Sequence, residues 1–307
     1  PVVVAAHRLR RYVLFGNLFA TQGEKTWRID RHPTMSRHPV TPMRESDLRL
    51  HLGMQAPDKA GLVDIVNLNG PDPSAALEKA LAENPANVVF DGLDERTELE
   101  TGRLLWERRA QYRFAIGSSG LTHALVAYWR KIGVIAQEFT PPAALAAERL
   151  IVVSGSCSPV TEEQIELAVR NGFASYHVAD FERDELLRRS LDALSQGKSL
   201  VIYSALGARE RRGSLNGEEL GGWLGDLLRE LILRSGVRRA ILAGGDTSSH
   251  AVSRLRIDAL TFAAPLAPGV PLCRVHSAEA SMEGVELALK GGQVGGPDFF
   301  EKVLKGY

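Results

Sequence analysis

Segments typical of β-strands and segments typical of α-helices alternate along almost the whole chain, and this alternation restricts the fold more than any other feature. It is typical of α/β proteins, in which helices connect the parallel strands of a sheet. In the first half the pattern predicts strands 12–20, 62–68, 87–90 and 114–117 and helices 45–54, 73–83, 98–113 and 121–131. In the second half it predicts strands near 150–154 and at 175–179, 199–205, 240–243 and 260–264, with helices 161–171, 217–235 and 250–255.

The chain is long enough for two domains. Its 307 residues suffice for two cores of ordinary size. Pro141 and Pro142 interrupt the alternation within the segment FTPPAALAAER. We therefore predict two α/β domains of the three-layer type, residues 1–145 and 146–307.

The composition excludes several classes of protein. Lys and Arg number 37 and Asp and Glu 37, so no excess of charge suggests binding to nucleic acid or to an anionic membrane. No apolar run reaches the roughly 18 residues of a membrane helix, and the first residues lack the layout of a signal peptide. Cys157 and Cys273 form neither a disulfide framework nor a CxxC motif, and we expect Cys157 to be a packed small residue. These features predict a cytoplasmic protein without nucleic-acid or membrane partners.

A turn rich in glycine and serine follows the first strand of the second half, in VSGSCSPVT (153–161). Thr161 and Gln164 have the spacing of a capping box and predict that a helix begins there. Small side chains let a ligand approach the backbone, and hydroxyl and amide groups bind phosphate or ribose. A tight turn without a ligand explains the spacing equally well.

A second glycine turn lies in AILAGGDTSS (240–249), before a helix that Thr247 or Ser248 can cap. Amide groups at a helix N-terminus suit phosphate oxygens. Asp246 is placed to hold Mg²⁺, which favours few carboxylates together with substrate phosphates. The alternative is that Asp246 only caps the helix.

A third turn, GGQVGGPDFF (291–300), is dense enough in glycine to lie flat against a base or a phosphate. It precedes a helix predicted to begin at the proline. The alternative is a surface turn before the C-terminal helix.

In the first half, RIDRHP (28–33) and RHPVTPM (37–43) form a proline-restricted loop with cationic donors. Arg37 and His38 suit a carboxylate or phosphate ligand, but a solvated loop before the next helix is an equal alternative. The segment FAIGSSGL (114–121) is another junction of strand, small residues and helix, and a second candidate anion site.

Several familiar motifs are absent. The chain has no P-loop, no GxGxxG after a strand, no HExxH and no GxSxG, and its eight histidines show no metal-ligand spacing. The missing glycine fingerprint excludes a typical dinucleotide-dependent oxidoreductase. The residues alone therefore indicate an α/β protein with several turns suited to phosphate.

Taken together, these segments resemble the four-carbon acid sugar kinase family, ATP-dependent kinases of 3-oxotetronate, D-threonate and D-erythronate. The resemblance covers almost the whole chain in the family's order. The matching segments are GNLFA (16–20), HPVTPM (38–43) with ESDLRLHL (45–52), GSSGL (117–121), SGSCSPVT (154–161), AGGDTSS (243–249), APGVP (267–271) and LALKGGQVGGPDFF (287–300).

The resemblance implies an N-terminal domain that binds the sugar acid and a C-terminal domain that binds the nucleotide. It implies that ATP contacts Ser156, Gly245, Asp246, Thr247, Ser248 and Gly295. Asp246 is then the expected catalytic residue and ligand of Mg²⁺. From chemistry we expect the substrate carboxylate to meet Arg37, His38, Gly117, Ser118, Ser119 and Gly120.

Two departures from the family pattern bear on activity. Family members carry an ADDFTGA-type motif and a KxCSTFDS-type segment upstream of GNLFA, and this chain contains neither. Where the family has a PAxPxxGR approach, this chain has AAHRLRR (5–11). We expect an N-terminally incomplete kinase of a four-carbon sugar acid in carbohydrate catabolism, with a homodimer as an open alternative to a monomer. The other reading is a non-catalytic remnant that binds nucleotide or sugar acid.

Overall fold

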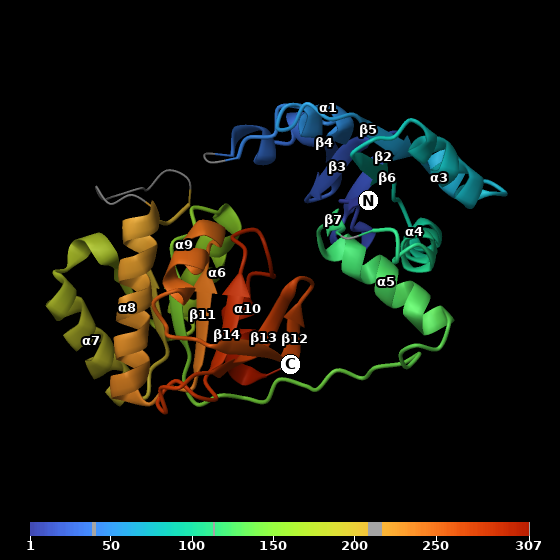
Figure 1. Ribbon diagram of the computed structural model, residues 1–307. Helices are drawn as coiled ribbons and strands as arrows, with labels where there is room; N and C mark the ends of the chain where they lie inside the picture. Colours follow the sequence, from blue (N-terminus) through green and yellow to red (C-terminus); the bar gives the residue numbers. More distant parts are fainter. Residues whose placement is uncertain (39–40, 113, 208–216, 307) are drawn as a thin grey trace. The chain divides into compact units, whose positions relative to one another are not determined.

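The computed structural model describes residues 1–38, 41–112, 114–207 and 217–306 (Figure 1). The chain divides into two compact units, Pro1–Phe139 and Thr140–Tyr307, a few residues before the boundary predicted from the sequence. The segment after Pro142 packs on the second unit. There the Ala147 amide donates to the Leu304 carbonyl at 2.8 Å, and the buried Arg239 guanidinium donates to the Leu145 carbonyl at 2.6 Å. Each unit is described separately below.

The second unit is built on a seven-stranded sheet of order β12-β13-β14-β11-β8-β10-β9. The five strands from β14 to β9 are parallel, and β12 and β13 continue the sheet as an antiparallel pair. The strands are β8 (Ile151–Ser154), β9 (Ala174–His177), β10 (Leu200–Tyr203), β11 (Arg239–Ala243), β12 (Ala259–Ala267), β13 (Val270–His276) and β14 (Glu286–Lys290). The sequence did not predict β13 and β14.

Helices cover both faces of this sheet, as predicted for a three-layer α/β domain. Along β8, Ile151 and Val153 join the core formed with α7, α8 and α9, whereas Val152 joins the core formed with α6 and α10. A central strand buried on both faces is apolar throughout, which explains why these strands were found as apolar runs. The helices are α6 (Pro159–Arg170), α7 (Arg183–Ser195), α8 (Gly217–Ser235), α9 (Gly245–Val252) and α10 (Phe299–Lys305) (Figure 1).

The strand order reverses direction beside β8. The chain passes from β8 to β9 and β10 on one side, and α8 then carries it to β11 on the other side of β8. In open α/β sheets, ligands bind at such a reversal, beyond the carboxyl ends of the two diverging strands. The fold therefore predicts that a ligand binds at the loops that follow β8 and β11.

The first unit has a four-stranded parallel sheet of order β5-β6-β1-β7. Helices α3 and α4 pack on one face, whereas α1 and a separate antiparallel sheet, β2-β3-β4, cover the other. The strands are β1 (Val2–Val3), β2 (Arg11–Leu14), β3 (Asn17–Gln22), β4 (Lys25–Arg28), β5 (Ala60–Val63), β6 (Asn87–Phe90) and β7 (Ile116–Gly117). The helices are α1 (Leu48–Gly53), α2 (Ile65–Leu68), α3 (Pro73–Ala82), α4 (Glu95–Glu107) and α5 (Ser119–Lys131).

Two predicted strands of this unit are wrong. The strand expected at 12–20 is a hairpin, because Phe15 and Gly16 have φ of 51° and 80° and form a two-residue turn between β2 and β3. The strand expected at 62–68 is β5 followed directly by α2, since the Asp64 carboxylate accepts the Asn67 amide and begins a helix.

Candidate functional site

Three glycine-containing loops begin side by side at the carboxyl edge of the second unit's sheet. The neighbouring strands β8, β11 and β14 end level with one another, since Ser154 pairs with Ala243 and Ala243 pairs with Lys290. We call the loops that follow them loop A (155–158), loop B (244–245) and loop C (291–298). The structure thus brings together the three turns that the sequence analysis considered separately, at the point where the strand order reverses.

The loops touch so closely that only glycine fits at their contacts. A Cβ atom on Gly155 of loop A would lie 2.0 Å from Thr247 Oγ1, and one on Gly292 of loop C would lie 2.4 Å from Ser156 Oγ. Gly244 of loop B has φ of +114°, and its Cβ would lie 3.1 Å from the Ser156 amide nitrogen. The three loops therefore form one cradle of closely packed backbone with Ser156 at its centre.

Replacing Gly155 with alanine tests this cradle. The new methyl group must displace Thr247 and the first turn of α9, and overpacking of this kind costs about 1–3 kcal/mol. We expect affinity for ATP to fall roughly tenfold in calorimetry, at 1.4 kcal/mol per factor of ten, with the fold retained. Gly217→Ala is the control, because a Cβ there meets nothing within 4 Å. Unchanged affinity in Gly155→Ala would contradict the cradle.

Helix α9 begins earlier than predicted. The sequence predicts its start at His250 with Thr247 or Ser248 as a cap, but Gly245 is already helical and the N-cap is Gly244, which offers no side chain. The first amides of the helix have no intrahelical acceptor and carry partial positive charge. Ser248 Oγ is buried and has no hydrogen-bond partner among the described residues. The backbone of Asp246 lies in this first turn, and its side chain lies outside the described part.

Helix α6 also differs from its prediction. It begins at Pro159 with Ser158 as N-cap, so Thr161 and Gln164 form no capping box. Thr161 Oγ1 instead donates to the Gly292 carbonyl at 2.9 Å, and Gln164 Nε2 donates to the carbonyls of Val294 and Gly296 at 3.1 and 2.9 Å. Both side chains hold loop C against α6. Loop C is therefore part of the cradle and not an isolated surface turn.

Gly295 lies in loop C with φ of +89°, a conformation that favours glycine. A Cβ there would lie 2.7 Å from Phe299 Cδ2, so a larger residue would also press against α10. The helix predicted to start at the proline begins two residues later, at Phe299.

Lys290, which the sequence analysis missed, lies beneath loop C at the end of β14. Its side chain is 1 % exposed, and Nζ donates to Thr161 Oγ1 and to the Gly291 carbonyl, each at 3.1 Å. No carboxylate forms an ion pair with it among the described residues. Burial lowers the pKa of Lys290 from 10.5 to about 8. A buried cation without a carboxylate partner, directly under a glycine loop, suits an anionic ligand.

In the first unit, the predicted turn Gly117–Gly120 joins β7 to α5. Ser118 is the N-cap of α5 but makes no side-chain cap, and its hydroxyl donates to the Val4 carbonyl at 3.2 Å. A Cβ on Gly120 would lie 1.6 Å from the Ala5 carbonyl oxygen, so the turn needs glycine where it meets the end of β1. The turn lies at the carboxyl edge of the sheet, where ligands of parallel sheets bind.

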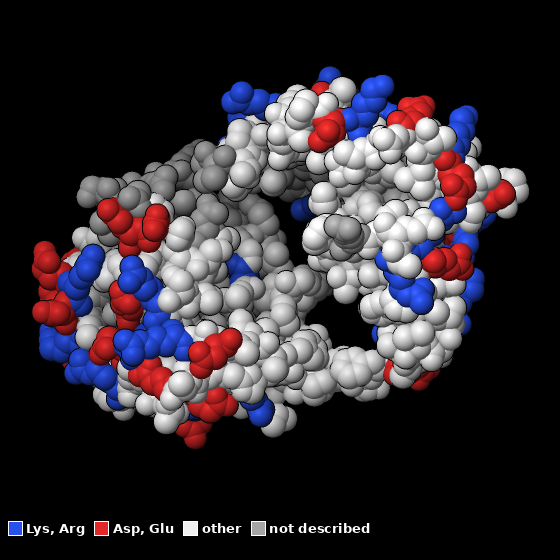
Figure 2. Space-filling view, viewed as in Figure 1, with Lys and Arg blue, Asp and Glu red and all other residues white. Residues whose placement is uncertain are grey.

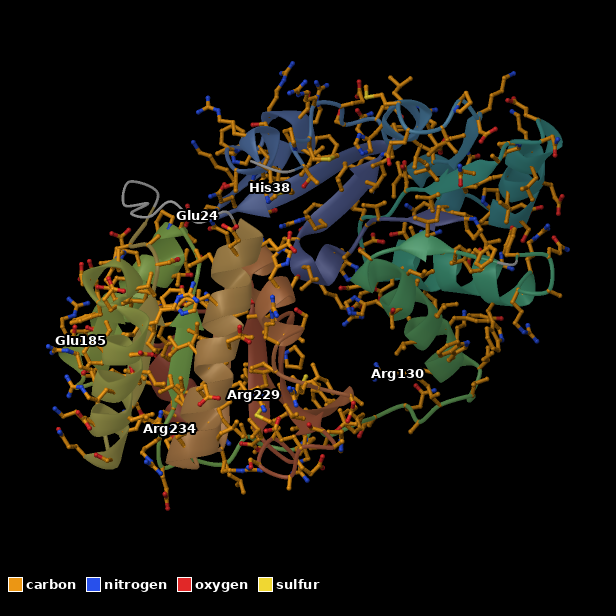
Figure 3. All side chains as sticks on the ribbon, turned by 60° about the vertical axis from the view of Figure 1, so that its left-hand side comes forward. Glu24, His38, Arg130, Glu185, Arg229 and Arg234 are labelled. Atoms are coloured by element: carbon orange, nitrogen blue, oxygen red, sulfur yellow. The ribbon has the colours of Figure 1, made fainter. Side chains whose placement is uncertain are left out.

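Arg37 and His38 lie in the segment between β4 and α1. His38 Nδ1 accepts the Thr41 amide at 3.0 Å, just as His32 Nδ1 accepts the amides of Thr34 and Met35 at 3.2 Å. Both histidines therefore shape their own proline-containing turns. Figure 3 shows His38 near the β3–β4 hairpin and away from α5. The role of Arg37 and His38 in binding the substrate carboxylate therefore stays a prediction.

Asp91, at the end of β6, is a second residue that the sequence analysis missed. Its carboxylate is 1 % exposed and accepts the backbone amides of Phe15, Gly16 and Ile65. Burial raises the pKa of Asp91 to about 6, although the three hydrogen bonds oppose the shift. Because all its contacts are to the backbone, Asp91 ties the β2–β3 turn and the start of α2 to the sheet.

Other kinds of site find no support in the described part of the chain. It contains no group of three His, Cys, Asp or Glu side chains placed to hold a metal ion. None of its helices has the length and apolarity needed to cross a membrane. In the face shown in Figure 2, side chains of both signs are mixed over α7 and α8, without a continuous basic stripe.

Two family models match the chain, one for each unit. A sugar-binding N-terminal domain matches residues 1–125, and a nucleotide-binding C-terminal domain matches residues 151–300. These matches agree with the placement of the cradle in the second unit.

Known proteins resemble the chain over most or all of its length. A 3-oxo-isoapionate kinase of Paraburkholderia graminis is 40% identical, over 100% of this chain and 70% of that protein. A 3-oxo-tetronate kinase of Methylobacterium radiotolerans is 30% identical, and the match covers 96% of this chain and 70% of that protein. A 3-oxo-tetronate kinase of Brucella melitensis is 29% identical, and the match covers 88% of this chain and 64% of that protein. The chain thus spans about two thirds of the length of these relatives.

Two crystal structures share the fold. A Salmonella typhimurium LT2 protein with a provisional tRNA synthase name has a TM-score of 0.71 at 24% identity, over 98% of this chain and 71% of that chain. Haemophilus influenzae protein HI1011 has a TM-score of 0.63, also at 24% identity, over 98% and 72%. These likenesses concern the fold alone.

Proposed function

Because this chain belongs to the four-carbon acid sugar kinase family, we propose that it transfers the γ-phosphoryl group of ATP to a hydroxyl group of a sugar acid. We propose a 3-oxo sugar acid as the acceptor. The relative that is 40% identical is a 3-oxo-isoapionate kinase, and the more distant ones are 3-oxo-tetronate kinases. D-Threonate and D-erythronate are the other acids expected from the sequence.

The observation that carries this proposal is the cradle above Lys290. Three glycine loops meet at the reversal of the strand order, and beneath one of them lies a buried cation that pairs with no carboxylate in the part of the chain that the structure describes. The Ser248 hydroxyl, which has no partner in that same part, and the start of α9, which has no side-chain cap, are two further groups that a phosphate would satisfy. These features fit the phosphates of a nucleoside triphosphate. We therefore assign its binding to Ser156, Gly245, Asp246, Thr247, Ser248 and Gly295, with Lys290 added to the set predicted from the sequence.

To catalyse phosphoryl transfer, a protein must position the two substrates and neutralise the negative charge of the phosphates. The amides at the start of α9 and the Lys290 ammonium supply positive charge around the phosphates. We propose that Asp246 would hold a Mg²⁺ ion, which would supply further positive charge beside the phosphates. In the first unit, the start of α5 at Gly117–Gly120 is the proposed seat of the substrate carboxylate. We keep Arg37 and His38 as proposed partners of that carboxylate.

Nucleotide binding with and without the metal ion tests this assignment. We expect Mg-ATP to raise the thermal midpoint more than ATP with a chelator, and Asp246→Ala to remove that difference, a loss of roughly tenfold in affinity. Asp226→Ala is the matched control, because Asp226 is an exposed carboxylate on α8 of the same unit. A metal-dependent shift that persists in Asp246→Ala would exclude Asp246 as the ligand. No shift with any nucleotide would exclude the nucleotide site.

A further inference from the structure

A histidine and a glutamate form a pair at the carboxyl edge of the first unit's sheet. His7 follows β1 in a short 3₁₀ turn, and its Nδ1 lies 3.2 Å from Oε2 of Glu98 on α4. The Glu98 side chain is 6% exposed, whereas His7 keeps 18% exposure. Arg8 also binds this carboxylate, with Nη2 3.0 Å and Nε 3.3 Å from Oε1. Glu98 is thus already paired with a permanent cation and does not require His7 for charge balance.

The pair favours one tautomer of the His7 ring. A carboxylate oxygen, which can only accept, lies 3.2 Å from Nδ1, so the neutral ring is favoured with its hydrogen on Nδ1 and its lone pair on Nε2. Among the described residues no group bonds to Nε2. A histidine whose one nitrogen is held by a buried carboxylate, with the other free and partly exposed, has the arrangement of a general base.

The surroundings of His7 are those of the proposed sugar-acid site. His7, Gly120 and three carboxylates, Asp91, Asp94 and Glu98, line one small cavity. The Ala5 carbonyl, two residues before His7, lies against Gly120 at the start of α5. His7 and the start of α5, the proposed seat of the substrate carboxylate, therefore border the same pocket.

The charges around His7 are of both signs. Glu98 from α4, Asp94 at the cap of α4 and Asp91 from the end of β6 face the cavity, and Arg8 lies beside Glu98. Burial opposes the ionisation of Asp94, but hydrogen bonds from Thr97 and then the charges of His7 and Arg96 hold its pKa below its ordinary value.

We infer that His7 is the general base of the reaction and that Glu98 positions it, an inference that rests on the proposed kinase function. His7 Nε2 accepts the proton of the substrate hydroxyl as its oxygen forms a bond to the γ-phosphorus of ATP. The bond between that phosphorus and the β,γ-bridging oxygen breaks, and ADP leaves with the electron pair. The imidazolium then returns its proton to water. Glu98 stabilises the imidazolium through Nδ1.

Steady-state kinetics of His7→Gln tests the inference. Gln can still donate to Glu98 but is no base, so we expect kcat to fall about 100-fold or more, with KM for the acid changed by less than about threefold. His7→Ala should regain part of its kcat when imidazole is added. Glu98→Gln should lower kcat by a smaller factor. His51→Gln, at a partly buried histidine of α1 in the same unit, is the matched control and should keep wild-type kcat.

Each other outcome is decisive. A kcat of His7→Gln within about threefold of the wild-type value, or a change in KM alone, overturns the inference and leaves the proposed kinase function intact. A fall in kcat that imidazole does not restore in His7→Ala, together with a lower thermal midpoint, assigns His7 a structural role and overturns it too. If the wild-type chain turns over no sugar acid, the proposed function itself fails, and the inference with it.

Discussion

Replacing Lys290 with methionine is expected to abolish most of the stabilisation that ATP gives the protein, while the free protein becomes no less stable. The ammonium holds Thr161 and loop C in place and puts a positive charge beneath the cradle. Losing a charge-assisted interaction costs about 1.5–3 kcal/mol, so affinity for ATP should fall roughly 10- to 100-fold. The free protein is relieved of a buried cation, and Thr161 keeps its hydrogen bond to the Gly292 carbonyl.

The pH dependence of stability gives an independent signature of the same residue. Burial lowers the pKa of Lys290 from 10.5 to about 8, so between these values the unfolded chain binds a proton that the folded chain has released. The free energy of unfolding therefore rises with pH across this window, by up to about 3 kcal/mol from this group. Below about pH 8 Lys290 is charged in the folded protein, and the full cost of burying this charge lowers the free energy of unfolding. The Lys290→Met variant should show no such rise in the free energy of unfolding between pH 8 and 10.5.

Both effects are measured on one set of proteins. Thermal midpoints with and without Mg-ATP report the nucleotide effect, and urea unfolding between pH 7.5 and roughly 10 reports the proton effect. Lys198→Met is the matched control, because Lys198 is an exposed lysine of the same unit. Undiminished ATP stabilisation in Lys290→Met would mean that the cation does not serve the nucleotide site.

Asp91→Asn is expected to destabilise the first unit by about 3 kcal/mol and to lower its thermal midpoint by about 10 °C. The wild-type carboxylate accepts three backbone amides, with both oxygens in use. The NH₂ group of asparagine cannot accept, so at least one buried amide loses its partner and faces another donor. The β2–β3 turn and the start of α2 should loosen first, which hydrogen exchange of the Phe15, Gly16 and Ile65 amides would detect.

A matched control separates this effect from a simple loss of charge. Asp64 caps α2 through the Asn67 amide, and asparagine caps helices as well as aspartate does, so Asp64→Asn should change the free energy of unfolding by less than about 0.5 kcal/mol. If Asp91→Asn were equally mild, Asp91 would not be the group that holds these segments together.

The sequence predicted best those elements whose pattern is long or strongly apolar. Helix α8 begins and ends at the predicted residues 217 and 235, because an apolar stripe from Leu220 to Leu231 repeats at the helical period. Strand β6 matches its prediction at 87–90. The hairpin at Phe15 and Gly16 was missed because an apolar run continues across its turn, and only the backbone conformation of these two residues divides it.

The candidate site could be predicted only in pieces. Each glycine turn follows a strand, but the order of strands in a sheet depends on contacts distant in the sequence, so the meeting of loops A, B and C was not visible. Helix starts were misplaced for a related reason. Thr161 and Gln164 have the spacing of a capping box, yet loop C takes their hydrogen bonds from more than a hundred residues away. Lys290 was overlooked because it ends an apolar strand, where a charged residue is normally exposed.

The most direct test of the central claim is ADP release by this 307-residue chain with Mg-ATP and a panel of sugar acids. The panel comprises 3-oxo-isoapionate, 3-oxotetronate, D-threonate and D-erythronate, and a reaction without acid gives the background. The account predicts acid-dependent formation of ADP with a 3-oxo acid, in amounts equal to the phosphorylated acid found by mass spectrometry. Binding of ATP without turnover on any acid would contradict it and would identify the chain as a nucleotide-binding protein that does not catalyse the transfer.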